Sequence, residues 1–166
     1  MVLALDISMS STGWAVINRN KKVLKYGKIV TKKDKFKSED ERMCYICNTI
    51  QEIITTHNIQ IVLVEDQFTS RNSKTILSLR KLLGAIMRTV KLNNMEIEYM
   101  YPVSIRKYLM NSGKAKKEEV AAYVRENIID IGEYIDRTCK AKSSDIYDAI
   151  ALGIAYLNKV SDAKIK

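Results

Sequence analysis

Val2-Leu3-Ala4-Leu5-Asp6-Ile7 forms an apolar run near the start of the chain that is interrupted by a single carboxylate. The run is short and rich in β-forming residues, as expected of a buried strand, and two similar runs follow at Gly13 to Asn18 and at Val23 to Ile29. Residues 18–21 have turn-forming side chains. Because such short connections join antiparallel strands, we predict a three-stranded antiparallel meander.

Helical and extended patterns alternate after this meander. Ser38 and Glu41 have the spacing of a capping box, which predicts a helix from there to about Thr56. The other predicted elements are a strand at Ile61 to Glu65, a helix at Ser73 to Leu92, a strand at Ile97 to Met100, helices at Ser104 to Met110 and Lys116 to Ile128 separated by Asn111-Ser112-Gly113, and a last helix from Ser143 or Ser144 to about Lys159. This order predicts an α/β fold: a five-stranded mixed sheet with helices on both faces.

Composition favours one folded domain. The chain has 166 residues, of which 46% are hydrophobic and 28% charged, with a single proline. We therefore expect one domain spanning residues 1–166 rather than a disordered or fibrous chain. No apolar run approaches the roughly 18 to 20 residues of a membrane span, and a signal peptide pattern is missing, so we expect a cytoplasmic protein without a membrane partner.

Positive charge favours a polyanionic partner. The net charge is +9, with a pI near 9.4. Residues 19–37 carry nine basic side chains and one acid, and residues 67–95 carry six basic side chains and no acid. Nucleic acid is the partner that fits such stretches best, and the alternative is a lysine-rich surface that only maintains solubility.

Three cysteines and one histidine raise the question of a zinc site. Cys44 and Cys47 have metal-ligand spacing, and Cys139 with His57 could complete a set of four. The alternative is that the first two thiols share one face of the predicted helix and bind no metal. The odd number of cysteines argues against a disulfide framework.

Four carboxylates are candidates for a metal centre. Asp6 and Glu65 end two apolar strands, where an ionised carboxylate needs a cation or water, and the alternative is that each acid ends in a solvated loop. Asp145 and Asp148 share one face at the start of the last helix, where acids also occur simply because they favour the helix dipole. If all four converge, they form an oxygen-rich site for two Mg²⁺ or Mn²⁺ ions of the kind that hydrolyses phosphodiesters.

Three stretches, in this order and spacing, resemble the RuvC family of Holliday junction resolvases: Leu5–Ala15, Val64–Phe68 and Ser144–Ala151. The basic stretch Gly113–Val120 adds to the likeness. The resemblance implies an RNase H-like fold, a homodimer, and symmetric Mg²⁺-dependent nicking of four-way DNA junctions with the four acids as metal ligands. A lysine- and isoleucine-rich composition fits an A·T-rich genome, of a bacterial cell or of a bacteriophage.

The resemblance also implies roles for other residues. Phe68 matches an aromatic near the strand-exchange point, Lys117 a basic residue near the scissile phosphate, and Arg106, or alternatively Lys107, a second one. The full set expected to contact DNA is Phe68, Arg71, Lys74, Arg80, Lys81, Arg106, Lys107, Lys114 and Lys116. The sequence departs from the family at Ile7 and Ser8, where proline and glycine are common, which puts the geometry of the first turn in question.

Three alternative functions remain open at this point. An actin-like ATPase or sugar kinase shares the first loop, but it needs a second phosphate loop and more chain. A non-catalytic DNA-binding module would have little reason to keep acids that repel phosphate. An RNase H-like nuclease for forks, flaps or RNA–DNA hybrids is harder to separate from a resolvase.

The helix at 73–92 is the predicted dimer contact. Its apolar residues cover more than one stripe, and Gly84 and Ala85 would allow a close approach of a second backbone. Two symmetric nicks also require two active centres. We expect Leu83→Asp to give monomers, and the alternative is a helix covered on all sides within its own monomer.

Overall fold

A computed structural model of the chain describes residues 1–66, 73–132 and 144–164, and its centre is a five-stranded sheet in the order β3-β2-β1-β4-β5. The strands are β1 (Val2–Asp6), β2 (Ser11–Ile17), β3 (Val23–Val30), β4 (Ile61–Glu65) and β5 (Glu96–Met100). β1, β2 and β3 are antiparallel neighbours, whereas β4 pairs in parallel with β1, and β5 in parallel with β4. The predicted meander and mixed sheet are confirmed.

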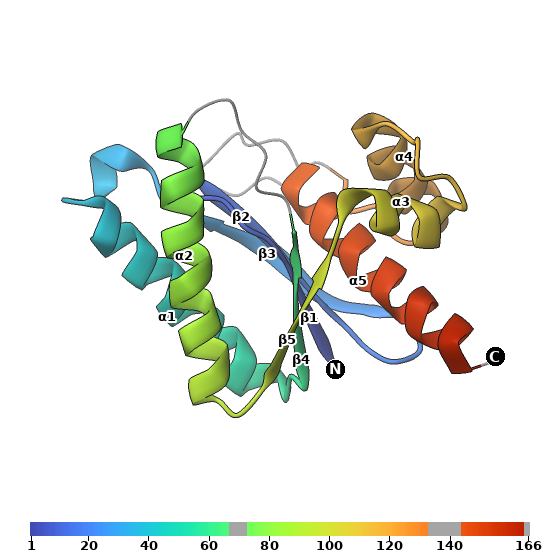
Figure 1. Cartoon of the computed structure of the whole chain (residues 1–166), viewed down its shortest axis with the longest axis horizontal. Coiled ribbons are helices and arrows are strands. Elements are labelled where there is room, and N and C mark those ends of the chain that lie inside the picture. Colours follow the sequence, from blue (N-terminus) through green and yellow to red (C-terminus); the bar gives the residue numbers. More distant parts are fainter. Residues whose placement is uncertain (67–72, 133–143, 165–166) are drawn as a thin grey trace.

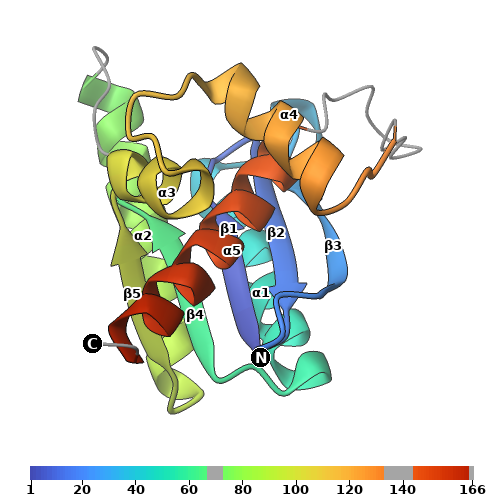
Figure 2. The ribbon, with the colours of Figure 1, turned by 90° about the vertical axis from the view of Figure 1, so that its right-hand side faces the viewer.

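Helices cover both faces of this sheet, as predicted. They are α1 (Glu39–His57), α2 (Ser73–Leu92), α3 (Pro102–Met110), α4 (Lys117–Asn127) and α5 (Ser144–Lys164). Figure 1 shows α1 and α2 on one side of the sheet and α3, α4 and α5 on the other, and Figure 2 looks onto α5 lying across the strands. No helix in the described ranges is long and apolar enough to cross a membrane.

Alternating residues of β1 enter two separate cores. Leu3 and Leu5 pack with the buried isoleucines of α1 and with α2, while Ala4 packs beneath α5. Both faces of β1 and β4 are therefore buried, which explains why these strands are almost uniformly apolar. Asp6 follows Ala4 by two residues and so lies on the α5 face, at the carboxyl end of its strand.

Small residues let α5 lie close to the sheet. A Cβ added at Gly153 would lie 2.4 Å from Cδ1 of Ile17 and 3.3 Å from Cβ of Ala4. At the other end of the contact, a Cβ added at Gly13 would lie 2.0 Å from the backbone oxygen of Asp145. Because ordinary Cβ contacts are longer than 3 Å, the first turn of α5 can occupy its place only above a glycine.

Element boundaries differ from the sequence prediction at a few points. α3 begins at Pro102, two residues earlier than predicted, because proline has no amide hydrogen to lose at a first helical position. α5 continues to Lys164, and a short 3₁₀ helix at Lys33–Lys35 was not predicted. The predicted cap of α1 is present, since Ser38 Oγ accepts a hydrogen bond from the amide of Glu41.

Candidate active site

Asp6 and Glu65 end neighbouring parallel strands. Leu5 of β1 pairs with Val64 of β4, and each is followed directly by its acid. Both acids follow alternate residues, Ala4 and Leu63, that pack in the α5 core, so they lie on the same face of the sheet. The structure therefore brings these two carboxylates to one edge.

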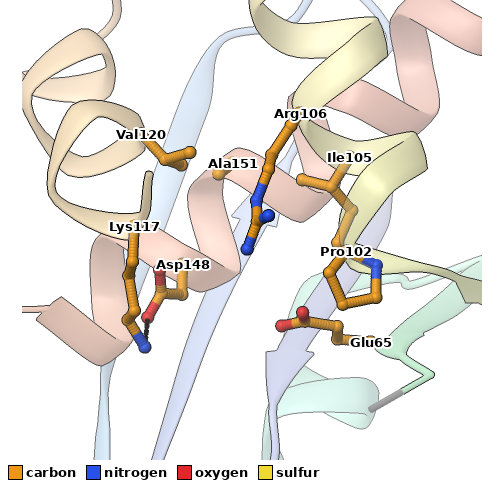
Figure 3. A pocket seen from close by; sticks show the side chains of 8 residues that line it. All are labelled: Glu65, Pro102, Ile105, Arg106, Lys117, Val120, Asp148 and Ala151. Carbon is orange, nitrogen blue, oxygen red and sulfur yellow. Dashed lines mark ion pairs between the residues drawn. The ribbon is translucent and has the colours of Figure 1, made fainter. Parts of the chain in front are cut away.

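The first turn of α5 adds two more carboxylates at this edge. Carboxylate oxygens of Asp6, Asp145 and Asp148 lie within 4.8 Å of one another. Glu65 extends into an adjoining open cavity of about 60 Å³ that Asp148 also lines, as Figure 3 shows. Acids from β1, β4 and α5 thus surround one small volume.

Burial makes these acids difficult to ionise together. Burial, followed by the charge of Asp148, raises the pKa of Asp6 to about 8. Burial also raises the pKa of Glu65 and of Asp148, although Lys117 acts in the opposite direction on both. The protein thus holds like charges together at a cost that added positive charge would offset.

Two basic side chains reach this cavity from the helices above it. Lys117 Nζ lies 2.5 Å from Asp148 Oδ2, and Arg106 lines the same cavity on α3 (Figure 3). Burial lowers the pKa of Lys117, but the hydrogen bond and charge of Asp148 more than offset this, so that its pKa is raised. Of the two alternatives in the sequence, Arg106 lines the cavity, whereas Lys107 is exposed.

Two further contacts to Asp145 were not expected from the sequence. Ser11 Oγ donates to Asp145 Oδ2 at 2.6 Å, and Lys28 Nζ lies 3.4 Å from the same oxygen. The position of Lys28 could have been inferred from the strand pairing. Asp6 pairs with Gly13 and Gly13 pairs with Lys28, so the three residues form one row across β1, β2 and β3. That row becomes visible only when the strand pairing is known.

The donor set fits a hard divalent cation. It contains only carboxylate oxygens, which suit Mg²⁺ or Mn²⁺ rather than a softer metal. Asp148 Oδ2 is buried and, among the described residues, receives no hydrogen bond of good geometry, although the Lys117 ammonium pairs with it. An oxygen that is buried and incompletely satisfied is available to a metal.

Side-chain hydrogen bonds hold the first turn, which lacks the proline and glycine of the related family. Ser8 has no positive φ, so its position does not require glycine. Its amide donates to Thr12 Oγ1 at 3.1 Å, and that hydroxyl donates back to the Ser8 carbonyl at 2.8 Å. The buried side chain of Arg42 donates to the Met9 carbonyl. The question raised by Ile7 and Ser8 is thus resolved by side-chain hydrogen bonds.

The other predicted DNA contacts are spread over several elements. Lys74, Arg80 and Lys81 are exposed on α2, and Lys114 and Lys116 are exposed before α4. Phe68 and Arg71 lie outside the described residues.

Within the described residues, the three-aspartate group is the one set of three or more potential ligands close enough to share an ion. Cys44 is exposed and Cys47 half-buried, both as free thiols, and neither forms such a set with His57. Cys139 lies outside the described residues. The described part of the chain therefore offers no support for the alternative zinc site.

Known proteins share both the sequence pattern and the fold. Residues 2–156 match the family described as crossover junction endodeoxyribonuclease RuvC. The RuvC proteins of Rickettsia akari and Rickettsia typhi are 30% and 29% identical to this chain, covering 99% and 95% of it and 99% and 96% of their own lengths. The structure of Thermus thermophilus RuvC in complex with a Holliday junction substrate has a TM-score of 0.79 at 20% identity, covering 97% of this chain and 94% of that one. The predicted RNase H-like fold is confirmed by this likeness.

Proposed function

The chain belongs to the RuvC family of crossover junction endodeoxyribonucleases, and on this premise we propose that it resolves four-way DNA junctions by paired nicks at the carboxylate cluster of Asp6, Glu65, Asp145 and Asp148. The activity is hydrolytic and acts on DNA. Family membership sets aside the alternative of an actin-like ATPase or sugar kinase. The observation that carries the assignment of the site is the convergence of acids from β1, β4 and α5.

Two divalent ions, Mg²⁺ or Mn²⁺, are the cofactors that this site would hold. Asp6 would be a central ligand, because its carboxylate lies within 4.8 Å of those of Asp145 and Asp148 and ends the strand that neighbours Glu65. When bound, such ions activate water and stabilise the leaving oxygen of a phosphodiester. Net charge also favours binding, since each ion offsets the repulsion that raises the pKa values of these acids.

Lys117 and Arg106 would contact the DNA backbone at the cut. Lys117 has a side chain that is 60% exposed although its ammonium is paired with Asp148, so it can turn toward an arriving phosphate. Arg106 lies across the same cavity and presents a planar set of donors that suits phosphate oxygens. Both would stabilise negative charge that develops on the phosphate during cleavage.

A basic surface would hold the arms of the junction. Exposed Lys74, Arg80 and Lys81 on α2, with Lys114 and Lys116 near the cavity, contribute to the net charge of +9. Phosphate contacts of this kind release counterions and provide most of the affinity for DNA. The basic side chains would thus attract junction DNA toward the carboxylate cluster.

A homodimer is part of the proposal, with α2 at its contact. Leu82, Ile86 and Val90 bury one face of α2 in its own core, whereas Leu77 and Met87 are 56% and 39% exposed. A Cβ added at Gly84 would meet nothing within 4 Å. Exposed apolar side chains therefore lie beside Gly84, and a symmetric partner would cover them while placing two active centres on one junction.

We also propose that this enzyme acts in the cytoplasm of a bacterial cell, or of a phage-infected one, and the bacterial origin of its relatives supports the first of these.

Cleavage of defined DNA tests this proposal. Immobile four-way junctions, forks and linear duplex of equal length are incubated with the enzyme in Mg²⁺ or EDTA, and nicks are mapped on all strands. We expect paired, symmetric nicks in the junction, dependent on Mg²⁺ and absent from Asp6→Asn. Equal cleavage of forks would favour the alternative of a general branched-DNA nuclease, and binding without cleavage would favour a non-catalytic module.

A further inference from the structure

The side chain of Lys28 is buried beside the carboxylate cluster. Its side chain is 1% exposed, and its ammonium lies 3.4 Å from Asp145 Oδ2, which is on the first turn of α5. Lys117, by contrast, pairs with Asp148 through a side chain that is 60% exposed. Removing an ammonium from water is costly unless it is paired, so the position of Lys28 indicates a specific role rather than a solvated surface charge.

The sheet register explains why Lys28 reaches Asp145. Lys28 pairs directly with Gly13, and Gly13 pairs with Asp6. Side chains of directly opposed residues share a face, so the lysine lies on the α5 side of the sheet. Because Gly13 has no side chain, α5 sits low above it, and the lysine can extend to the carboxylate of the first helical turn.

Asp145 is held on both of its oxygens. Ser11 Oγ and Lys28 Nζ contact Oδ2, and Ser144 Oγ donates to Oδ1 at 3.2 Å. Two of these partners are neutral, so among the described residues that contact this acid Lys28 supplies the positive charge. The carboxylate is therefore both oriented and partly neutralised before any metal arrives.

We propose that Lys28 is a positioning residue that serves as an internal counter-ion of Asp145: it holds this ligand in place and competes with divalent cations for its charge. The inference rests on the proposed metal-binding role of Asp145. Lys28 would thus weaken metal binding while improving the geometry in which the metal is used. If Lys28 has this role, its removal should strengthen metal binding and at the same time slow DNA cleavage.

Lys28→Met tests the idea, because methionine has a similar length and no charge. We expect the dissociation constant for Mn²⁺, measured by calorimetry without DNA, to fall on the order of tenfold, since a positive charge near the ion is lost. Junction cleavage at saturating metal should fall by about tenfold or more, because Asp145 loses its support. Lys25→Met is the matched control: Lys25 is exposed on the same strand, and its removal should change neither quantity.

A second measurement keeps the proposal testable if Lys28→Met folds poorly. The metal-free melting temperature should drop in Lys28→Met and recover in Lys28→Met with Asp145→Asn, because the double variant has no uncompensated carboxylate. Unchanged or weaker Mn²⁺ binding in Lys28→Met would overturn the inference, as would a double variant that recovers no stability. A wild-type protein that binds no Mn²⁺ would instead refute the proposed metal centre itself.

Discussion

Gly13 lies directly beneath Asp145: a Cβ added to the glycine would come within 2.0 Å of the Asp145 backbone oxygen and 2.4 Å of its carbonyl carbon. The close approach places the first turn of α5, with Asp145 and Asp148, against the carboxyl end of β1, where Asp6 lies. One methyl group would therefore move Asp145 and Asp148 away from Asp6.

Gly13→Ala should abolish most cleavage, because backbone atoms rather than a flexible side chain occupy the space. Gly153→Ala is the matched control on the same helix–sheet contact, since its closest clash is with the movable end of Ile17. We expect Gly153→Ala to lower the melting temperature but to keep its Mn²⁺ affinity. Gly13→Ala should lower both the melting temperature and the Mn²⁺ affinity. Full metal binding by folded Gly13→Ala protein would contradict this view of the site.

Removal of any one carboxylate should separate binding from cleavage. Asp6→Asn, Glu65→Gln, Asp145→Asn and Asp148→Asn each delete an anionic ligand, and we expect cleavage to fall at least about 100-fold. Junction affinity in gel-shift assays should stay the same or rise, because a charge that repels phosphate is gone. Asp162→Asn, an exposed acid late in the same helix, is the control and should behave as wild type. Near-normal nicking by three of the four variants would refute the assignment.

The raised pKa of Asp6 predicts that the metal-free protein loses stability as pH rises. The pKa is about 8 in the folded chain against an ordinary value of 3.8, so between these values the unfolded chain binds fewer protons. The free energy of unfolding in EDTA should thus decrease from about pH 4 to pH 8, by on the order of 5 kcal/mol from this group, because each pKa unit corresponds to about 1.4 kcal/mol. Urea unfolding of the wild type and of Asp6→Asn, each in EDTA at pH 5 and pH 8, measures this change in the free energy of unfolding. Equal pH dependence in both proteins would argue against Asp6 as the source.

Dimer formation should depend on the exposed face of α2. Leu77→Asp places a charge on a residue that is 56% exposed, so the monomer should still fold. In a dimer this charge would be buried at the contact, and the dimer should therefore dissociate. Leu83, the position that the sequence suggests, packs partly against its own core, and its substitution would mix folding with assembly. Light scattering should give twice the 19.0 kDa chain mass for wild type and for the control Leu24→Asp on β3, and the single mass for Leu77→Asp. A monomeric wild type that still makes paired cuts would exclude the dimer.

Salt should weaken junction binding steeply. Each phosphate neutralised on duplex DNA contributes a slope of about −0.9 in log K against log salt. Lys114→Glu, at an exposed position before α4, should reduce the magnitude of this slope by about one contact. Glu52→Lys on α1 is a charge-changing control away from the proposed surface. Affinity that is insensitive to salt between low and physiological ionic strength would exclude a phosphate-dominated interface.

Local patterns in the sequence predicted the main strands and helices, apart from shifts at their ends, and drew attention to the four acids. Apolar alternation, turn residues and the Ser38 cap depend only on near neighbours in the chain, so they predict β1, β2 and β3 and the helix that follows them. Asp6 and Glu65 stand out because a carboxylate is rare at the end of a buried strand.

Tertiary structure alone decided which side chains support those acids. The contact of Lys28 with Asp145 joins residues more than a hundred positions apart, and it depends on the register of three strands and on the height of α5 above Gly13. The choice of Arg106 over Lys107 depends in the same way on how α3 is rotated above the cavity. Register and helix rotation result from packing of the whole core, and for that reason a local pattern draws attention to the four acids but not to the residues that contact them.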